Sequence, residues 1–166
     1  MLPPSLNVLS NLKELRLVNC PRLKCLPDSL GQLSMLEVKC CPGLVDVRTL
    51  PTMLIQLSLI SCPKLKKIDL GLFGLVELQT LNLSWWTKVE ELAGIETLVS
   101  LEELRASGCE NLKRIRGLGQ LTKIKQLDVH GCSKIEELEG VERLRLLEKL
   151  DDSDCPALHC VGRVPR

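Results

Sequence analysis

Aliphatic residues recur along this chain with a spacing that repeats seven times. The segments LRLVNCPRLKCL at 15–26, LSLISCPKLKKI at 57–68 and LDVHGCSKIEEL at 127–138 show the pattern most clearly. In each, two aliphatic residues flank one polar residue, which is the alternation of a short strand with one buried face. We therefore predict one short strand at the start of every repeat.

The repeats keep one register along the whole chain. Their first aliphatic residues are separated by 21, 21, 24, 23, 23 and 23 residues. The first positions are Leu12, Leu33, Leu54, Leu78, Leu101, Ile124 and Leu147. The residues eight positions later are Cys20, Cys41, Cys62, Trp86, Cys109, Cys132 and Cys155. The resulting pattern, L-x-x-L-x-L-x-x-C-x-x-L, resembles the leucine-rich repeat (LRR).

This resemblance implies an α/β solenoid in the form of a horseshoe with about seven repeats. We expect a parallel concave sheet and a convex side of irregular or 3₁₀ turns, because only about a dozen residues separate the strands. We expect residues 1–166 to form one LRR domain, a fragment of a longer solenoid. LPPSL at 2–6 resembles the back half of a repeat, and Asp152 stands where an inward aliphatic residue is expected.

Composition and charge exclude several classes of function. The formal net charge is +1, so nothing attracts the chain to nucleic acid or to an anionic membrane. No apolar run is long enough to span a membrane. The chain has no phosphate-binding G-x-x-x-x-G-K-[ST] loop and no G-x-S-x-G motif. We therefore expect neither an enzyme nor a cofactor.

The nine cysteines do not have the spacing of a metal site. Six of them occupy the repeat position, and no C-x-x-C pair or Cys/His cluster accompanies them. We expect no metal site and no Cys–His nucleophile. Cysteines stacked on adjacent strands would lie about 4.8 Å apart, within disulfide reach, so free thiols favour a reducing compartment. The expected location is cytoplasmic or nuclear.

The outward positions of the predicted strands form a mixed polar and apolar surface. Ile60 and Trp85 are apolar and lie on adjacent repeats, which favours an interaction site. Trp86 occupies the cysteine position, so we expect it to pack or strain the column there. The residues that we predict to bind a protein on the concave face are Arg16, Val18, Glu37, Lys39, Ser58, Ile60, Asn82, Ser84, Trp85, Arg105, Asp128 and His130.

Paired charges of alternating sign follow the cysteine position in four successive repeats. They are Lys66-Lys67, Glu90-Glu91, Lys113-Arg114 and Glu136-Glu137. Stacked side chains of opposite charge stabilise neighbouring strands, whereas alternating signs cancel any charged patch. We therefore predict a charge row that stabilises the stack.

The repeats also resemble one family of LRR proteins. The segment from Leu15 to Pro27, the pairs Gly108-Cys109 and Gly131-Cys132, and the short period are similar to the LRR domains of plant intracellular nucleotide-binding LRR (NLR) immune receptors, the TIR class above all. That resemblance implies effector sensing and autoinhibition. The implied partners are a pathogen effector or a guarded host protein, and other domains of the parent receptor. The alternatives are the substrate-binding LRR of a ubiquitin-ligase adaptor and a structural LRR scaffold.

Overall fold

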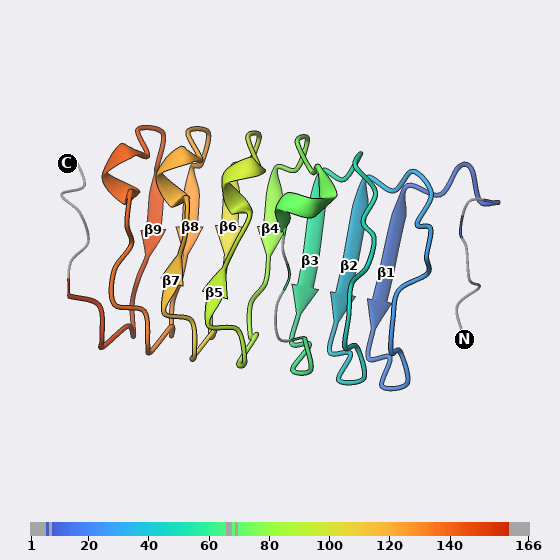
Figure 1. Cartoon of the computed structure of the whole chain (residues 1–166), viewed down its shortest axis with the longest axis horizontal. Helices are drawn as coiled ribbons and strands as arrows, with labels where there is room; N and C mark the ends of the chain where they lie inside the picture. Colours follow the sequence, from blue (N-terminus) through green and yellow to red (C-terminus); the bar gives the residue numbers. More distant parts are fainter. Residues whose placement is uncertain (1–5, 7, 66–67, 69, 160–166) are drawn as a thin grey trace.

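The chain forms a solenoid of parallel strands (Figure 1). The computed structural model describes residues 6, 8–65, 68 and 70–159. Seven strands make one sheet in the order of the chain, and each pairs in parallel with its neighbours. They are β1 (Glu14–Val18), β2 (Met35–Lys39), β3 (Gln56–Ile60), β4 (Thr80–Asn82), β6 (Glu103–Arg105), β8 (Gln126–Asp128) and β9 (Lys149–Asp151).

Short elements cover the opposite side of the solenoid. A second sheet of two parallel strands joins β5 (Glu91–Leu92) to β7 (Arg114–Ile115). The helical segments of the described residues are 3₁₀ turns: η1 (Leu70–Phe73), η2 (Ile95–Thr97), η3 (Leu118–Gln120) and η4 (Val141–Arg143). The prediction of a solenoid with a parallel sheet and 3₁₀ turns is confirmed.

Inward aliphatic residues fill the space between the two sides. Leu36, Leu57, Leu81, Leu104 and Leu127 stack in register and are at most 1% exposed. No single repeat encloses its own leucines, so stacking removes them from water. The N-terminal resemblance to a half repeat involves residues 2–5, which lie outside the described residues. Leu6 is buried, and its N–H donates to the Ser29 carbonyl.

The residue before the cysteine position turns the chain in every repeat. All seven have a left-handed backbone, with φ between 53° and 70°. They are Asn19, Cys40, Ser61, Trp85, Gly108, Gly131 and Asp154. Glycine and asparagine accept this conformation readily, whereas a bulky residue such as tryptophan rarely adopts it.

The cysteine position forms a column of hydrogen bonds between repeats. The thiols of Cys41, Cys109 and Cys132 donate to the carbonyls of Leu17, Leu83 and Ala106, the third residue before the cysteine position of the previous repeat. Trp86 is fully buried, and its indole N–H donates to the equivalent carbonyl, that of Leu59. The tryptophan therefore replaces the thiol in the same hydrogen bond.

The described cysteines are all free thiols, and Cys160 lies outside the described residues. No described helix has the length and apolar character that a membrane-spanning helix needs.

Candidate functional site

The outward side chains of the seven-stranded sheet form one continuous surface, which we call the sheet face. It is the face that the sequence predicted to be concave. Of the twelve predicted residues, eleven are exposed or half-buried on it. Their positions fall into an N-terminal, a central and a C-terminal part.

The N-terminal part of the sheet face carries paired charges. Arg16 on β1 lies 3.7 Å from Glu14 on its own strand and 3.6 Å from Glu37 on β2. Lys39 is exposed, and Val18 beside it is 46% exposed. The arginine is therefore largely neutralised by its neighbours, whereas Lys39 remains open to a partner.

The central part is less polar, and one prediction there is wrong. Ser58 and Ile60 on β3 are half-buried, as is Asn82 on β4. Ser84, which we predicted to be exposed, is only 6% exposed. The Asn82 side chain folds back to accept the Ser84 backbone N–H at 3.0 Å.

Trp85 is the largest exposed side chain at the centre of the sheet face. Its side chain is 52% exposed, its φ is 65°, and its backbone N–H donates to the Ser107 carbonyl at 2.8 Å. Its ring lies against the next repeat, because a Cβ built on Gly108 would meet the ring carbon Cε3 at 2.5 Å. The missing side chain of Gly108 thus makes room for the indole. Trp85 is held in a costly backbone conformation with one ring face supported and the rest open.

The C-terminal part is rich in aspartate. Arg105 forms an ion pair with Glu103 on its own strand. Asp128 accepts a hydrogen bond from the Ser107 hydroxyl at 2.6 Å. The ring Nδ1 of His130 lies 2.9 Å from the Ser153 hydroxyl and 3.8 Å from the Asp154 carboxylate.

Three acidic residues of this part were absent from the predicted set. Asp151 is aligned with Asp128 on the neighbouring strand, Asp154 lies at the following turn, and Glu103 is one strand away from Asp128. Hydrogen bonds from the Ser153 side chain and backbone lower the pKa of Asp151, which keeps its carboxylate charged. The recurrence of aspartate at the middle strand position was the sequence signal for an acidic end.

Side-chain amide and carboxylate groups also explain why three of the four later strands are short, whereas β6 is equally short and ends at Arg105. β1, β2 and β3 each contain five residues, whereas β4, β8 and β9 contain three. The last residues of β4, β8 and β9 are Asn82, Asp128 and Asp151, and each of these side chains accepts the backbone N–H two residues later. Such Asx turns divert that N–H into a local bond and end the regular strand.

Among the described residues, the predicted charge row is formed between Glu90-Glu91 and Lys113-Arg114. Lys113 lies 2.8 Å from Glu90, while Arg114 and Arg116 lie 3.8 Å and 2.5 Å from Glu91. The hydrogen bond from Lys113 lowers the pKa of Glu90. Lys66 and Lys67 lie outside the described residues. Between residues 70 and 159, no ion pair within 4.0 Å joins Glu136 or Glu137 to Lys113 or Arg114, so the next step of the row is not made.

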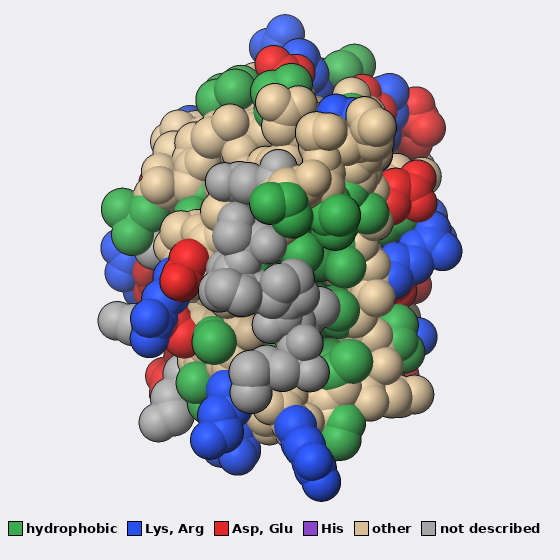
Figure 2. All heavy atoms as spheres, turned by 90° about the vertical axis from the view of Figure 1, so that its right-hand side faces the viewer, with side chains coloured by type: hydrophobic (Ala, Val, Ile, Leu, Met, Phe, Trp, Pro, Cys, Tyr) green, Lys and Arg blue, Asp and Glu red, His purple; other side chains and the backbone are tan. Residues whose placement is uncertain are grey.

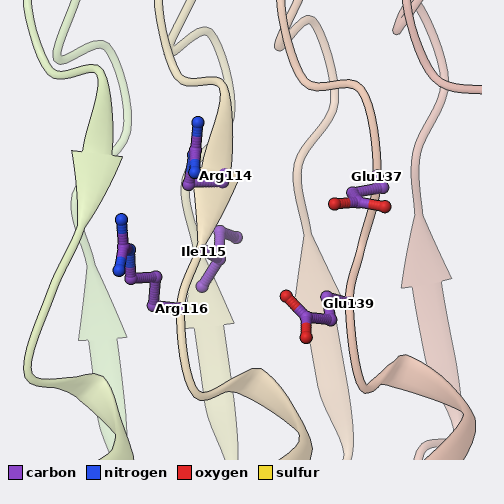
Figure 3. A pocket seen from close by; sticks show the side chains of 5 residues that line it. All are labelled: Arg114, Ile115, Arg116, Glu137 and Glu139. Carbon is purple, nitrogen blue, oxygen red and sulfur yellow. The ribbon is translucent and has the colours of Figure 1, made fainter.

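A shallow hollow of about 170 Å³ lies between these two repeats, where the expected ion pairs are absent. Arg114, Ile115 and Arg116 line one side of it, and Glu137 and Glu139 the other. Figure 3 shows Arg116 extending away from the two glutamates, which agrees with its ion pair to Glu91 on the preceding repeat. The hollow lies beside β7, on the side opposite the sheet face. It is therefore separate from the predicted binding residues.

The arrangement of the sheet face offers a contact surface. In the part of the chain that the structure describes, no group of three or more His, Cys, Asp or Glu side chains is placed to hold a metal ion. The apolar side chains of Ile60 and Trp85 lie between a basic position at Lys39 and the aspartates at the C-terminal end.

Comparison with known proteins supports the fold. No family model and no curated protein matches the chain. A similar solved structure is the leucine-rich repeat domain of the type III effector XopL, which has 25% sequence identity and a TM-score of 0.53 to this chain. The similarity covers 90% of this chain and 71% of that one. This chain therefore has a leucine-rich-repeat solenoid fold, which is the fold of a protein–protein interaction module.

Proposed function

We propose that the sheet face binds a protein partner, with Trp85 as its central anchor and Ile60 beside it. The observation that carries the proposal is the placement of Trp85. A half-exposed tryptophan in a left-handed turn costs about 1–2 kcal/mol of backbone strain. Tryptophan is also the residue type most often found at energetic hot spots of interfaces.

The charges around the anchor indicate the chemistry of the partner. Asp128, Asp151 and Asp154 lie on the C-terminal side of Trp85, and Lys39 lies on its N-terminal side. A partner that places an apolar side chain on Trp85 and basic side chains toward the aspartates would match this pattern. Complementary charges of this kind contribute more to specificity and association rate than to affinity.

We propose further that the module is the effector-sensing and autoinhibitory LRR of a plant intracellular NLR, of the TIR class. Support comes from the repeat pattern, in which cysteine is often followed by proline. The partner would then be a pathogen effector or a guarded host protein, and the other domains of the receptor would form the second set of contacts. The proposed location is cytoplasmic or nuclear, and the domain itself has no enzymatic role. A nucleotide-binding P-loop upstream in the parent gene would support this assignment, whereas an F-box-like segment would favour a ubiquitin-ligase adaptor.

The binding surface is tested by truncating side chains of matched exposure. Pathogen effectors and host proteins displayed as a panel are screened against the chain, and binding of any partner is then measured by titration. Trp85→Ala and Ile60→Ala should each weaken binding about tenfold or more. Val99→Ala is the control, because Val99 is 54% exposed and lies outside the sheet face.

A second pair of variants tests the position of the ring. Gly108 and Gly131 have φ values of 69° and 70°, so alanine is equally strained at both positions. A Cβ at Gly108 would displace the Trp85 ring, whereas at Gly131 the nearest atom is 3.7 Å away. Gly108→Ala should therefore weaken binding and change the tryptophan fluorescence, while Gly131→Ala should affect stability alone. Equal loss of binding for both variants, or loss for Val99→Ala only, would contradict the proposed site.

A further inference from the structure

The turn residues that follow β4, β6, β8 and β9 form a row along one side of the sheet face. They are Trp85, Gly108, Gly131 and Asp154, and all four have a left-handed backbone. The Trp85 ring lies over Gly108, because a Cβ built there would meet three of its ring atoms at 2.5–2.8 Å. The Asp154 side chain is 81% exposed. The row therefore carries an aromatic ring at one end and a carboxylate at the other.

The step between the ring and the carboxylate is open. Among the described residues, and apart from its own chain neighbours, no side chain comes within 4 Å of a Cβ built on Gly131. Equivalent positions on stacked strands lie about 4.8 Å apart, so Asp154 is about 10 Å from Gly108, on which the ring rests. A short slot with a floor of backbone atoms thus separates the Trp85 ring from Asp154.

The carboxylates around this slot are not neutralised by basic side chains. Asp128 and Asp151 accept hydrogen bonds from uncharged hydroxyl and backbone N–H groups, and among the described residues neither forms an ion pair. Asp154 lies 3.8 Å from the His130 ring, which is charged only when it is protonated. This side of the slot therefore has an excess of negative charge at neutral pH.

The N-terminal end of the molecule has a different distribution of charge. Figure 2 views that end and shows basic and acidic side chains next to each other along its edges. On the sheet face, Arg16 lies 3.7 Å from Glu14 and 3.6 Å from Glu37. A basic group of a partner is therefore attracted to the C-terminal part of the sheet face rather than to the N-terminal part.

We propose that the slot accepts one arginine side chain of the protein partner. The three-methylene stem of this arginine lies along the Trp85 ring and crosses above Gly131, and its guanidinium group meets the Asp154 carboxylate. One residue then supplies both the apolar contact on the ring and the positive charge near the aspartates. This inference rests on the proposed function, since it names the side chain that the Trp85 anchor receives.

The chemistry of the slot favours arginine over the other candidates. A guanidinium group is planar, stacks on an aromatic ring and donates two parallel N–H bonds to a carboxylate. A lysine ammonium is a compact, strongly hydrated charge, so it gains less from the ring and from the shape of the carboxylate. A leucine would pack on Trp85 and leave Asp154 without a partner.

Peptides that differ in one residue test this selection. The probes are Gly-Ser-Gly-X-Gly-Ser-Gly with capped ends, in which X is arginine, citrulline, lysine or norleucine. Each is titrated into the ¹⁵N-labelled chain, in which the two tryptophans give separate indole N–H signals. The arginine peptide should shift the signals of the Trp85 indole and of the Gly131 and Asp154 amides. Citrulline has the same shape without the charge, and its peptide should bind about fivefold more weakly or less.

Three variants locate the site of binding. Trp85→Ala and Asp154→Asn should each weaken binding of the arginine peptide about fivefold or more. Gly131→Asn should do the same, because its side chain fills the slot, whereas the methyl group of alanine leaves the slot open. Asparagine tolerates the left-handed backbone, as Asn19 does at the equivalent position. Asp28→Asn is the matched control, since Asp28 is exposed outside the sheet face, and circular dichroism checks that each variant is folded.

Three results would overturn this inference and leave the proposed function standing. The first is a lysine or norleucine peptide that binds as tightly as the arginine peptide. The second is an arginine peptide that leaves the Trp85 indole signal in place. The third is a protein partner whose binding falls with Trp85→Ala and is unchanged by Asp154→Asn and Gly131→Asn. A partner whose binding is unchanged by Trp85→Ala as well would contradict both proposals.

Discussion

At the scale of single residues, Trp86 shows how one position can change its chemistry and keep its role. The six cysteines in that column are small, and tryptophan is the largest residue. Trp86 and the buried Cys41, Cys109 and Cys132 each present one hydrogen-bond donor to the equivalent carbonyl of the previous repeat. The hydrogen bond therefore defines the position, and the surrounding leucines adjust to the volume.

Replacing Trp86 by phenylalanine should remove that hydrogen bond while keeping an aromatic ring. The Leu59 carbonyl would then be buried without this partner, so unfolding should become easier by about 1–3 kcal/mol. Urea denaturation followed by circular dichroism measures the change. Trp85→Phe is the control, since it also removes an indole N–H but from a side chain that is 52% exposed. Similar losses for both variants would mean that the Leu59 bond contributes little.

At the scale of elements, polar side chains decide where strands end and which repeats are tied together. Asn82, Asp128 and Asp151 end their strands by Asx turns. The ion pairs join adjacent repeats unevenly: Lys113 and Arg114 pair with the glutamates of the preceding repeat, and among the described residues no ion pair joins them to Glu136 or Glu137. A second row, in which Lys125 lies 2.8 Å from Glu102 and is also attracted by Glu148, was not predicted.

Reversing the charge of Glu90 and Glu91 to lysine should destabilise the solenoid at low salt and much less at high salt. Adding Lys113→Glu and Arg114→Glu should restore part of the lost stability, since these two pairs re-form with reversed sign while Arg116 still faces a lysine at position 91. The pKa of Glu90 is lowered in the folded state. The stabilising contribution of Glu90 is therefore present above the pKa that this group has in the unfolded chain. It is lost as the pH falls through the pKa of Glu90 in the folded protein.

Denaturant melts at two salt concentrations and at neutral and acidic pH measure these effects. The destabilisation caused by Glu90→Gln should shrink as the pH falls. A four-residue reversal no more stable than the two-residue reversal would show that Glu136 and Glu137 do repel the changed charges.

At the scale of the whole molecule, the thiol column runs along the core, and its inner members Cys41, Cys62, Cys109 and Cys132 are buried. Burial raises the pKa of Cys41, and it raises the pKa of Cys62 to about 11. Both thiols therefore stay protonated at neutral pH and react slowly with alkylating reagents, whereas Cys25 is exposed.

Raising the pH from about 9 to about 11 should lower the free energy of unfolding. A folded pKa above the unfolded value means that the stabilising effect is complete below the unfolded pKa and is lost as the pH rises through the folded pKa. Thermal or urea unfolding across this pH range measures how steeply the free energy of unfolding falls with pH. Cys62→Ala should flatten it, and Cys25→Ala should leave it unchanged. An equal slope in all three proteins would assign the alkaline loss to other groups.

The sequence by itself determined the repeat, the strand positions, the inward residues and most of the sheet face. It could do so because a solenoid repeats one local pattern, and the next repeat supplies the packing that each pattern needs. Eleven of the twelve predicted surface residues point outward for this reason. The left-handed turn falls at the residue before the cysteine position in every repeat.

Tertiary structure decided what depends on distances between repeats. Ser84 is buried beside Asn82, which accepts its backbone N–H, and Trp85 is supported because Gly108 leaves space in the next repeat. The charge row is formed between Glu90-Glu91 and Lys113-Arg114 and not at the next step, because each long basic side chain can reach more than one carboxylate.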